Sequence, residues 1–186
     1  MHHIAIFASG TGSNARKIIE YFRGSRAARI ALVVSNKQDA GVLDIARANG
    51  IPALVIHRNA FYSTEDLLRG LASHAVDFIV LAGFLWLIPP YLVRAFPRRI
   101  VNIHPALLPK FGGKGMYGMH VHEAVKAAGE AQTGITIHYV NEHYDAGDII
   151  FQAACPVGPE DTPGSIAARV QQLEHRHFPE IIARLL

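Results

Sequence analysis

Short runs of β-branched and other apolar residues alternate with amphipathic helical patterns over the first two thirds of the chain. This alternation is typical of βαβ units, whose parallel strands form a sheet covered by helices. We expect strands at residues 3–8, 30–35, 53–57, 78–82 and 100–104, and helices at residues 14–22, 40–48, 64–74 and 90–96. Asp39 and Ser63 are expected to cap the second and third helices, and Gly50 to end the second.

The pattern changes in the last third of the chain. Residues 134–140 alternate in polarity, residues 148–157 form a second extended run, and turn-forming residues lie between the two. This order predicts an antiparallel hairpin. Thr162 and Pro163 then favour the start of a long amphipathic helix that runs towards Leu186. No repeat or linker divides the chain, so we expect a single α/β domain over residues 1–186 with a mostly parallel sheet.

Composition excludes several classes of protein. With 186 residues, 50% of them hydrophobic and 18% charged, the chain can bury a core and is not of the disordered class. The longest apolar run, residues 78–90, is shorter than the roughly 20 residues of a membrane helix. No signal peptide or basic cluster is found, which predicts a cytoplasmic protein that binds neither membranes nor nucleic acids. The net charge of +3 permits a small anionic ligand.

A glycine-rich loop, ASGTGSNA, follows the first predicted strand at residues 8–15. Its backbone amides and the start of the next helix favour binding of a phosphate. The second strand ends without the acidic residue that would hold an adenosine ribose, so NAD binding is disfavoured. The alternative interpretation is a plain glycine turn in which Ser13 or Asn14 only caps the helix.

Asn102 and His104 end the fifth predicted strand and, two residues apart, share one of its faces. An amide that can stabilise an oxyanion beside an imidazole that can move a proton suits acyl chemistry. Asp145 lies in the turn of the predicted hairpin, and it would raise the pKa of His104 if the two side chains were close. Otherwise, Asp145 is only a turn residue.

The remaining candidates have weaker patterns. Residues 85–88 form an apolar loop that would either wall a flat ring or pack beneath the next helix. The pairs His120-x-His122 and His175-x-His177 lack the spacing of a zinc site, so no metal is expected. The single cysteine, Cys155, cannot form an internal disulfide, and we interpret it as a small buried hydrophobe.

Four blocks, ASGTGSN, LAGF, NIHPALLPK and YDAGDII, span nearly the whole chain. In their residues and order the chain resembles the phosphoribosylglycinamide formyltransferases of the folate-dependent formyltransferase superfamily. The resemblance implies a single-domain Rossmann-like fold, with a phosphate- and nucleotide-binding half at about residues 1–100 and a folate-binding and catalytic half at about residues 101–186. It also implies formyl transfer from 10-formyltetrahydrofolate, a co-substrate used without a metal, to the primary amine of glycinamide ribonucleotide in purine biosynthesis.

The resemblance also implies roles for individual residues. Asn102 would stabilise the tetrahedral oxyanion, His104 would be the general acid and base, and Asp145 would raise the pKa of His104. The implied glycinamide ribonucleotide ligands are Gly12, Ser13, Asn14, Gln171 and Glu174. The implied folate contacts are Leu85, Trp86, Leu87, Ile88 and Asn102, with Thr64 at a position where relatives often carry arginine.

The glycine-rich segment at residues 110–120 is longer than the corresponding link in the family that the chain resembles. We expect Lys110 or Lys114 in this segment to add a phosphate contact, and the alternative is a mobile, solvated loop.

Other functions stay open at this point. A formyltetrahydrofolate deformylase would use Asn102, His104 and Asp145 on water, but usually has an extra N-terminal domain. A methionyl-tRNA formyltransferase would need a C-terminal domain that binds tRNA. A non-catalytic folate- or nucleotide-binding module could keep the glycine-rich and apolar loops, but it would not need the three polar residues together. The sequence permits a monomer or a homodimer.

Overall fold

The computed structural model describes residues 1–186 and contains one seven-stranded sheet with the strand order β3-β2-β1-β4-β5-β6-β7. The strands are β1 (His2–Phe7), β2 (Ala28–Ser35), β3 (Ala53–Val55), β4 (Phe78–Leu81), β5 (Ile100–His104), β6 (Gln132–Tyr139) and β7 (Ile149–Pro156). The first five strands are parallel, whereas β6 and β7 are antiparallel to their neighbours. The mostly parallel sheet and the C-terminal hairpin are therefore confirmed.

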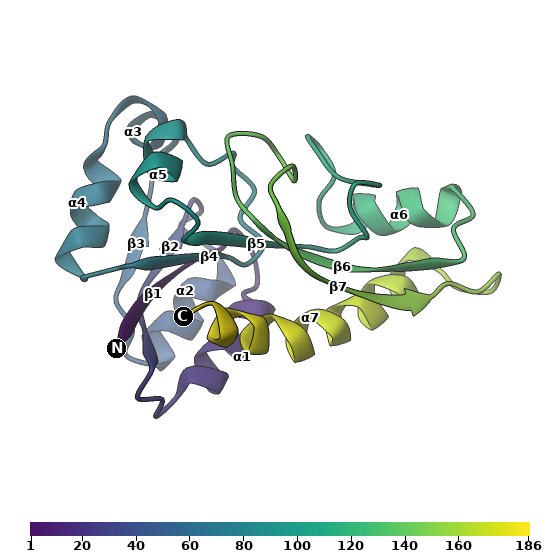
Figure 1. Ribbon diagram of the computed structural model, residues 1–186, viewed down its shortest axis with the longest axis horizontal. Helices are drawn as coiled ribbons and strands as arrows, with labels where there is room; N and C mark the ends of the chain where they lie inside the picture. The colour runs from purple at the N-terminus through teal and green to yellow at the C-terminus, as the bar shows by residue number, and fades with distance from the viewer.

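Helices cover both faces of this sheet (Figure 1). They are α1 (Ser13–Phe22), α2 (Gly41–Ala48), α3 (Arg58–Ser63), α4 (Asp66–Ser73), α5 (Pro90–Ala95), α6 (Met119–Ala127) and α7 (Pro163–Leu185). α1, α2 and α7 enclose the larger core, to which Ile18, Val42 and Ile166 belong. α3, α4 and α5 enclose a second core on the opposite face. Cys155 is buried in the larger core, as the sequence predicted.

The topology directs ligands to one edge of the sheet. From β1 the chain builds outward through β2 and β3, and it then returns to place β4 on the other side of β1. The loops after β1 and β4 consequently leave the sheet in opposite directions and open a crevice at the carboxyl ends of the strands, which is where open α/β sheets bind ligands. β5 lies beside β4, so Asn102 and His104 reach the same edge.

Two cap predictions are wrong. α2 begins at Gly41 after Ala40, and Asp39 forms no cap because the carbonyl oxygen of Gly10 already accepts the N–H of Val42 at 3.2 Å. Ser63 ends α3, a short helix that was not predicted, and therefore does not start the next one. The helix predicted at residues 64–74 is present as α4, which begins after Glu65. Gly50 follows α2 with φ of 65°, which matches its predicted place.

The C-terminal helix α7 begins as predicted. Thr162 and Ser165 exchange hydrogen bonds between side chain and backbone in a capping box, which satisfies free amides at the helix start. α7 is the longest helix of the protein with 23 residues, yet neither it nor any other helix has an apolar stretch that could cross a membrane.

Candidate active site

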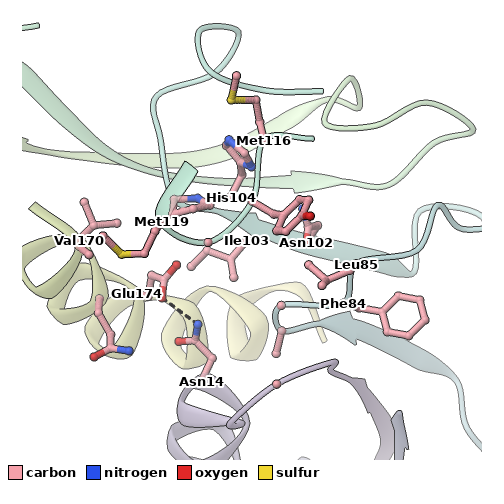
Figure 2. A pocket seen from close by; sticks show the side chains of 18 of the residues that line it. Asn14, Phe84, Leu85, Asn102, Ile103, His104, Met116, Met119, Val170 and Glu174 are labelled. Carbon is pink, nitrogen blue, oxygen red and sulfur yellow. Dashed lines mark hydrogen bonds between the residues drawn. The ribbon is translucent and has the colours of Figure 1, made fainter. Parts of the chain in front are cut away.

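A cavity of about 960 Å³ occupies the crevice at the carboxyl ends of β1, β4 and β5. Its walls come from the loops after β1 and β4, the end of β5, residues 113–119, the turn of the β6–β7 hairpin and one face of α7. Figure 2 shows Asn14 and Glu174 at one end, with Asn102 and His104 across the cavity from them. The sequence-predicted phosphate loop and the Asn-His pair therefore open into a single space.

The phosphate-loop end joins the first helix to the last. Asn14 Nδ2 donates a hydrogen bond to Glu174 Oε2 at 2.9 Å, and Gln171 Nε2 donates to Ser13 Oγ at 3.3 Å. Gly12 has φ of 78°, and a Cβ at this position would lie 2.9 Å from Cα of Val42. Only glycine fits this turn without displacing α2, so the loop is shaped by close packing as well as by its own conformation.

Asn14 and Glu174 place an amide oxygen and a carboxyl group in a buried position at this end of the cavity. Asn14 Oδ1 is buried and has no hydrogen-bond partner. Burial raises the pKa of Glu174 above the usual range of a carboxyl group, and the Asn14 hydrogen bond offsets this rise only in part. Because buried polar groups without partners are costly, this pair is suited to a polar ligand that satisfies both.

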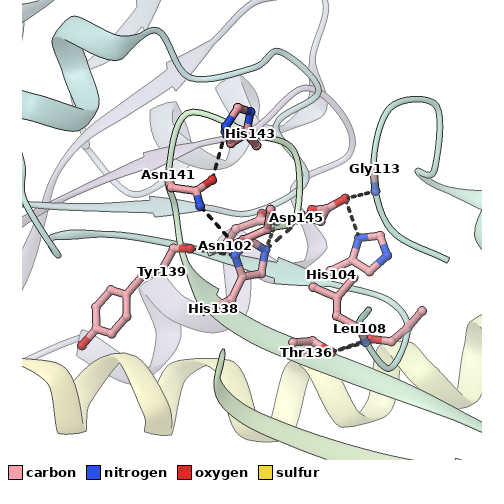
Figure 3. A network of polar contacts seen from close by, with 12 residues as sticks. Asn102, His104, Leu108, Gly113, Thr136, His138, Tyr139, Asn141, His143 and Asp145 are labelled. Carbon is pink, nitrogen blue, oxygen red and sulfur yellow. Dashed lines mark hydrogen bonds and ion pairs between the residues drawn. The ribbon is translucent and has the colours of Figure 1, made fainter. Parts of the chain in front are cut away.

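At the other end of the cavity, the β6–β7 hairpin brings Asp145 against both residues of β5 (Figure 3). Asp145 Oδ2 lies 3.5 Å from His104 Nδ1, and Asp145 Oδ1 lies 3.4 Å from Asn102 Nδ2. His104 is only 3% exposed, and its Nε2 lies 2.7 Å from the carbonyl oxygen of Phe111. The contact between His104 and Asp145, which the sequence left open, is present in the structure.

Burial and charge act in opposite directions on His104. Burial lowers its pKa, while the negative charge of Asp145 and the hydrogen bond to Phe111 raise it, and the net effect is a pKa below the usual histidine value. Asp145 therefore acts in the predicted direction, but burial outweighs it. Burial also raises the pKa of Asp145, yet its contacts with His138, His104 and Gly113 together lower it more, so this carboxylate stays charged at neutral pH.

Sequence reasoning missed His138, a second buried histidine of this network. β5 and β6 pair Asn102 directly with His138, and Asn102 Nδ2 lies 3.1 Å from His138 Nε2. His138 Nδ1 lies 2.8 Å from the carbonyl oxygen of Tyr139, and His138 Nε2 also lies 3.6 Å from Asp145 Oδ1. The available signal was a histidine in the alternating strand that neighbours the Asn-His strand.

The apolar loop after β4 contributes less to the cavity than predicted. Leu85 lines the cavity together with Phe84, which the sequence analysis did not select. Trp86 does not line it, because its ring packs against Phe61 and Tyr62 at centroid distances of 5.5 Å and 6.2 Å. Of residues 85–88, only Leu85 therefore lines the cavity.

Three other predicted folate residues also lie outside the cavity walls. Tyr62 donates its hydroxyl proton to the carbonyl oxygen of Leu87 at 3.0 Å, and Ile88 is buried in the second core. Thr64 bonds locally, since its Oγ1 donates to the carbonyl oxygen of Ala60 at 3.0 Å. Local packing and helix-end hydrogen bonds occupy these residues.

The glycine-rich segment separates the two predicted lysines. Lys114 lines the cavity, whereas Lys110 does not and instead forms an ion pair with Glu130 at 2.7 Å. The same segment and its surroundings supply further lining residues that the sequence did not indicate, namely Met116, Tyr117, Met119, His122, Tyr144 and Val170. No group of three or more His, Cys, Asp or Glu side chains is arranged so that it could hold a metal ion.

Comparison with known proteins agrees with this arrangement. The family model described as formyl transferase matches residues 2–182. The chloroplastic phosphoribosylglycinamide formyltransferase of Arabidopsis thaliana is 48% identical over 98% of this chain and 64% of its own length. The Haemophilus influenzae phosphoribosylglycinamide formyltransferase is 37% identical over 98% of this chain and 86% of its own length.

Solved structures give the same result. Glycinamide ribonucleotide transformylase 1 from Geobacillus kaustophilus superposes with a TM-score of 0.90 at 35% identity, over 100% of this chain and 99% of that one. The chain spans 64% and 60% of the length of two plant relatives. With the family model over almost all residues, these matches show that the chain belongs to the formyl transferase family, among the phosphoribosylglycinamide formyltransferases.

Proposed function

We propose that this protein transfers a formyl group from 10-formyltetrahydrofolate to the primary amine of glycinamide ribonucleotide, which yields formylglycinamide ribonucleotide and tetrahydrofolate. The observation that carries the proposal is the contact of an amide, an imidazole and a carboxylate in a cavity that also contains a glycine-rich phosphate loop. The names of two relatives, both phosphoribosylglycinamide formyltransferases, support the ribonucleotide as the formyl acceptor.

The ribonucleotide is assigned to the phosphate-loop end. Amides of the loop that contains Gly12 and Ser13 bind the phosphate, aided by the start of α1. Asn14, Gln171 and Glu174 bind the ribose and glycinamide groups, and the unpartnered Asn14 Oδ1 and the buried Glu174 carboxyl support this assignment. The substrate therefore contacts both the N-terminal half, about residues 1–100, and the C-terminal half, about residues 101–186, of a single domain.

The folate is assigned to the side of the cavity formed by Leu85, Phe84 and Asn102. Its formyl carbon then lies between the amine of the ribonucleotide and the Asn102–His104 pair. Lys114, which also lines the cavity, contributes a positive charge that attracts the ribonucleotide phosphate.

The reaction requires no covalent enzyme intermediate. The amine nitrogen attacks the formyl carbon, a C–N bond forms, and the carbonyl electrons move to oxygen. Asn102 donates a hydrogen bond to this oxyanion. The bond from carbon to N10 of the folate then breaks, N10 gains a proton and the attacking nitrogen loses one, with His104 as the group that moves the proton. Asp145 holds the imidazole and stabilises its charged form.

A steady-state assay with 10-formyltetrahydrofolate, with and without glycinamide ribonucleotide, tests the proposal. Wild type should turn over only with the ribonucleotide, and His104→Ala should lose about 10²- to 10⁴-fold in kcat. His120→Ala is the matched control, because His120 is an exposed histidine of α6 outside the cavity walls. Turnover without the ribonucleotide would indicate a deformylase, and none in either condition would indicate a binding module or another acceptor.

A further inference from the structure

Residues 111–113 lie over the His104–Asp145 pair and bond to both of its members through the backbone. The carbonyl oxygen of Phe111 is 2.7 Å from His104 Nε2, and the N–H of Gly113 donates to Asp145 Oδ2 at 2.9 Å. Figure 3 shows Gly113 bonded to the same carboxylate that faces His104. We call residues 111–113 the strap.

The contact with Phe111 fixes which ring nitrogen of His104 carries the proton. A carbonyl oxygen only accepts hydrogen bonds, so Nε2 must hold a proton to bond with it. In the neutral imidazole, Nδ1 then has the free electron pair, and it is the nitrogen that gains and loses a proton. This nitrogen faces Asp145 at 3.5 Å. The strap thus determines the tautomer of His104 as well as its orientation.

The backbone of Phe111 and of Asp145 adopts a left-handed conformation, which surrounding contacts must stabilise. Phe111 has φ of 55° and Asp145 has φ of 50°, and only two other non-glycine residues of the chain, Ala75 and Arg98, have a positive φ. The left-handed region disfavours residues with a Cβ and persists where surrounding contacts hold it, often at functional sites. Both contact partners of His104 therefore occupy this unfavourable region.

Gly112 allows the strap to approach the pair this closely. A Cβ on Gly112 would lie 2.5 Å from Leu108 Cδ2 and 3.3 Å from Asp145 Cβ. Leu108 has little freedom to move away, because it is 6% exposed and its N–H donates to Thr136 Oγ1 at 3.0 Å. Any side chain at position 112 must push the strap away from Asp145 or displace a buried leucine.

We propose that the strap is a positioning element of the catalytic centre, in which the Phe111 carbonyl fixes His104 as the Nε2–H tautomer and the Gly113 amide orients the Asp145 carboxylate. The proposal deepens the proposed function and rests on it for its kinetic consequence, whereas the tautomer can be observed without any substrate. It assigns a role to the glycine-rich segment beyond lining the cavity.

The first test is nuclear magnetic resonance of the ¹⁵N-histidine-labelled protein without ligands, with His104 assigned by comparison with His104→Gln. Above the His104 pKa, wild type should show protonated Nε2 and unprotonated Nδ1. Gly112→Ala should give a mixture of the two His104 tautomers, and Gly112→Val should increase the share of the Nδ1–H tautomer further. The pKa of His104 should also fall, because the Phe111 bond raises it. His122, His138 and Asp145 also influence or face His104, so the signals of the two histidines are followed too.

The second test is kinetic. Gly112→Ala should lower kcat by about 10²-fold, the effect of displacing a catalytic group by roughly 1 Å, with little change in either KM. Gly164→Ala is the matched control. A Cβ added at Gly164 would lie 3.7 Å from its nearest neighbour, Thr162 Oγ1, and Gly164 lies outside the cavity walls. Thermal unfolding of each variant identifies any variant that fails to fold. If the Gly112 variants do not fold, the proposal is judged by the tautomer of His104 in the wild-type protein alone.

Three results would overturn the proposal. The first is a wild-type His104 that is protonated on Nδ1 or shows both tautomers equally. The second is a folded Gly112 variant with the wild-type tautomer, pKa and kcat. The third is a Gly112 variant that loses activity only through KM, since this would indicate a binding role for the segment. Failure of formyl transfer with a confirmed Nε2–H tautomer would instead contradict only the proposed function.

Discussion

Asn14 and Glu174 are separated by 160 positions in the sequence, yet their side chains meet at 2.9 Å in one wall of the cavity. This bond joins the start of α1 to the middle of α7, and it couples the phosphate loop to the C-terminal helix. Since each side chain holds the other in place, their contributions to substrate binding should not be independent.

A double-mutant cycle measures this coupling. Asn14→Ala and Glu174→Ala should each raise the KM for glycinamide ribonucleotide, and their combined effect should differ from the sum by about 0.5–3 kcal/mol. The exposed pair of Lys17 and Glu20 on α1, 2.8 Å apart, is the control, and its alanine variants should leave this KM unchanged. Additive effects of the Asn14 and Glu174 variants would contradict a shared binding role.

Asn102 is expected to act mainly on the chemical step. Asn102→Ala removes the proposed oxyanion donor, and kcat should fall by about 10²- to 10³-fold. The KM for the folate should rise by a smaller factor, because Asn102 also lines the folate side of the cavity. Asn49→Ala, at the exposed end of α2, serves as the control for an asparagine outside the cavity. A loss expressed only in KM would instead assign Asn102 to ground-state binding.

Asp145→Asn should change the pH dependence of the reaction. The charge of Asp145 raises the pKa of His104, so its removal leaves burial to lower that pKa further. The acidic limb of the kcat/KM profile, which reports protonation of His104, should therefore move to lower pH while the maximal rate falls. Glu142→Gln removes a carboxylate from the same hairpin turn at an exposed position and should leave the limb in place. An acidic limb at the same pH in Asp145→Asn and wild type would contradict the role of Asp145 in raising the pKa of His104.

The two lysines of the glycine-rich segment provide an internal comparison. Lys114 lines the cavity, and Lys114→Ala should raise the KM for the ribonucleotide about two- to fivefold, as expected for loss of one exposed charge contact. Lys110→Ala should not, because Lys110 is paired with Glu130 outside the cavity walls. Equal KM values for wild type and Lys114→Ala would show that the charge of Lys114 does not contribute to substrate binding.

Acid should destabilise the fold through the same buried pair. His104 has a folded-state pKa below the usual histidine value of 6.5, so the unfolded chain binds more protons and stability declines as the pH drops below that value. Asp145 has a folded-state pKa below the usual aspartate value of 3.8, so its stabilisation is present above that value and is lost as the pH falls through the folded pKa.

Urea unfolding from neutral pH down to about pH 5 measures the His104 contribution. His104→Gln should show a shallower decline of stability over this range than wild type. The comparison uses the slope against pH, which does not depend on how much the substitution alters packing. Parallel slopes would mean that other histidines account for the whole decline.

The parts of the fold that depend on local pattern were predictable from the sequence. Alternation of strand and helix patterns predicted five parallel strands and the final hairpin, and the two-residue spacing of Asn102 and His104 placed both on one face of β5. The prediction failed where several short-range preferences compete. The short helix α3 was not predicted, Ser63 ends it instead of capping α4, and the cap expected from Asp39 is replaced by a backbone contact with Gly10.

The sequence by itself determined most of the elements, the glycine-rich loop after β1 and the polar pair on β5, because these depend on periodicity and on the backbone needs of residues such as Gly12. Only the tertiary structure decided which distant groups meet that pair. Strand pairing brings His138 beside Asn102, the hairpin turn carries Asp145 to His104, and packing turns Trp86 away from the cavity. These contacts depend on register and on three-dimensional packing, which no spacing within one segment encodes.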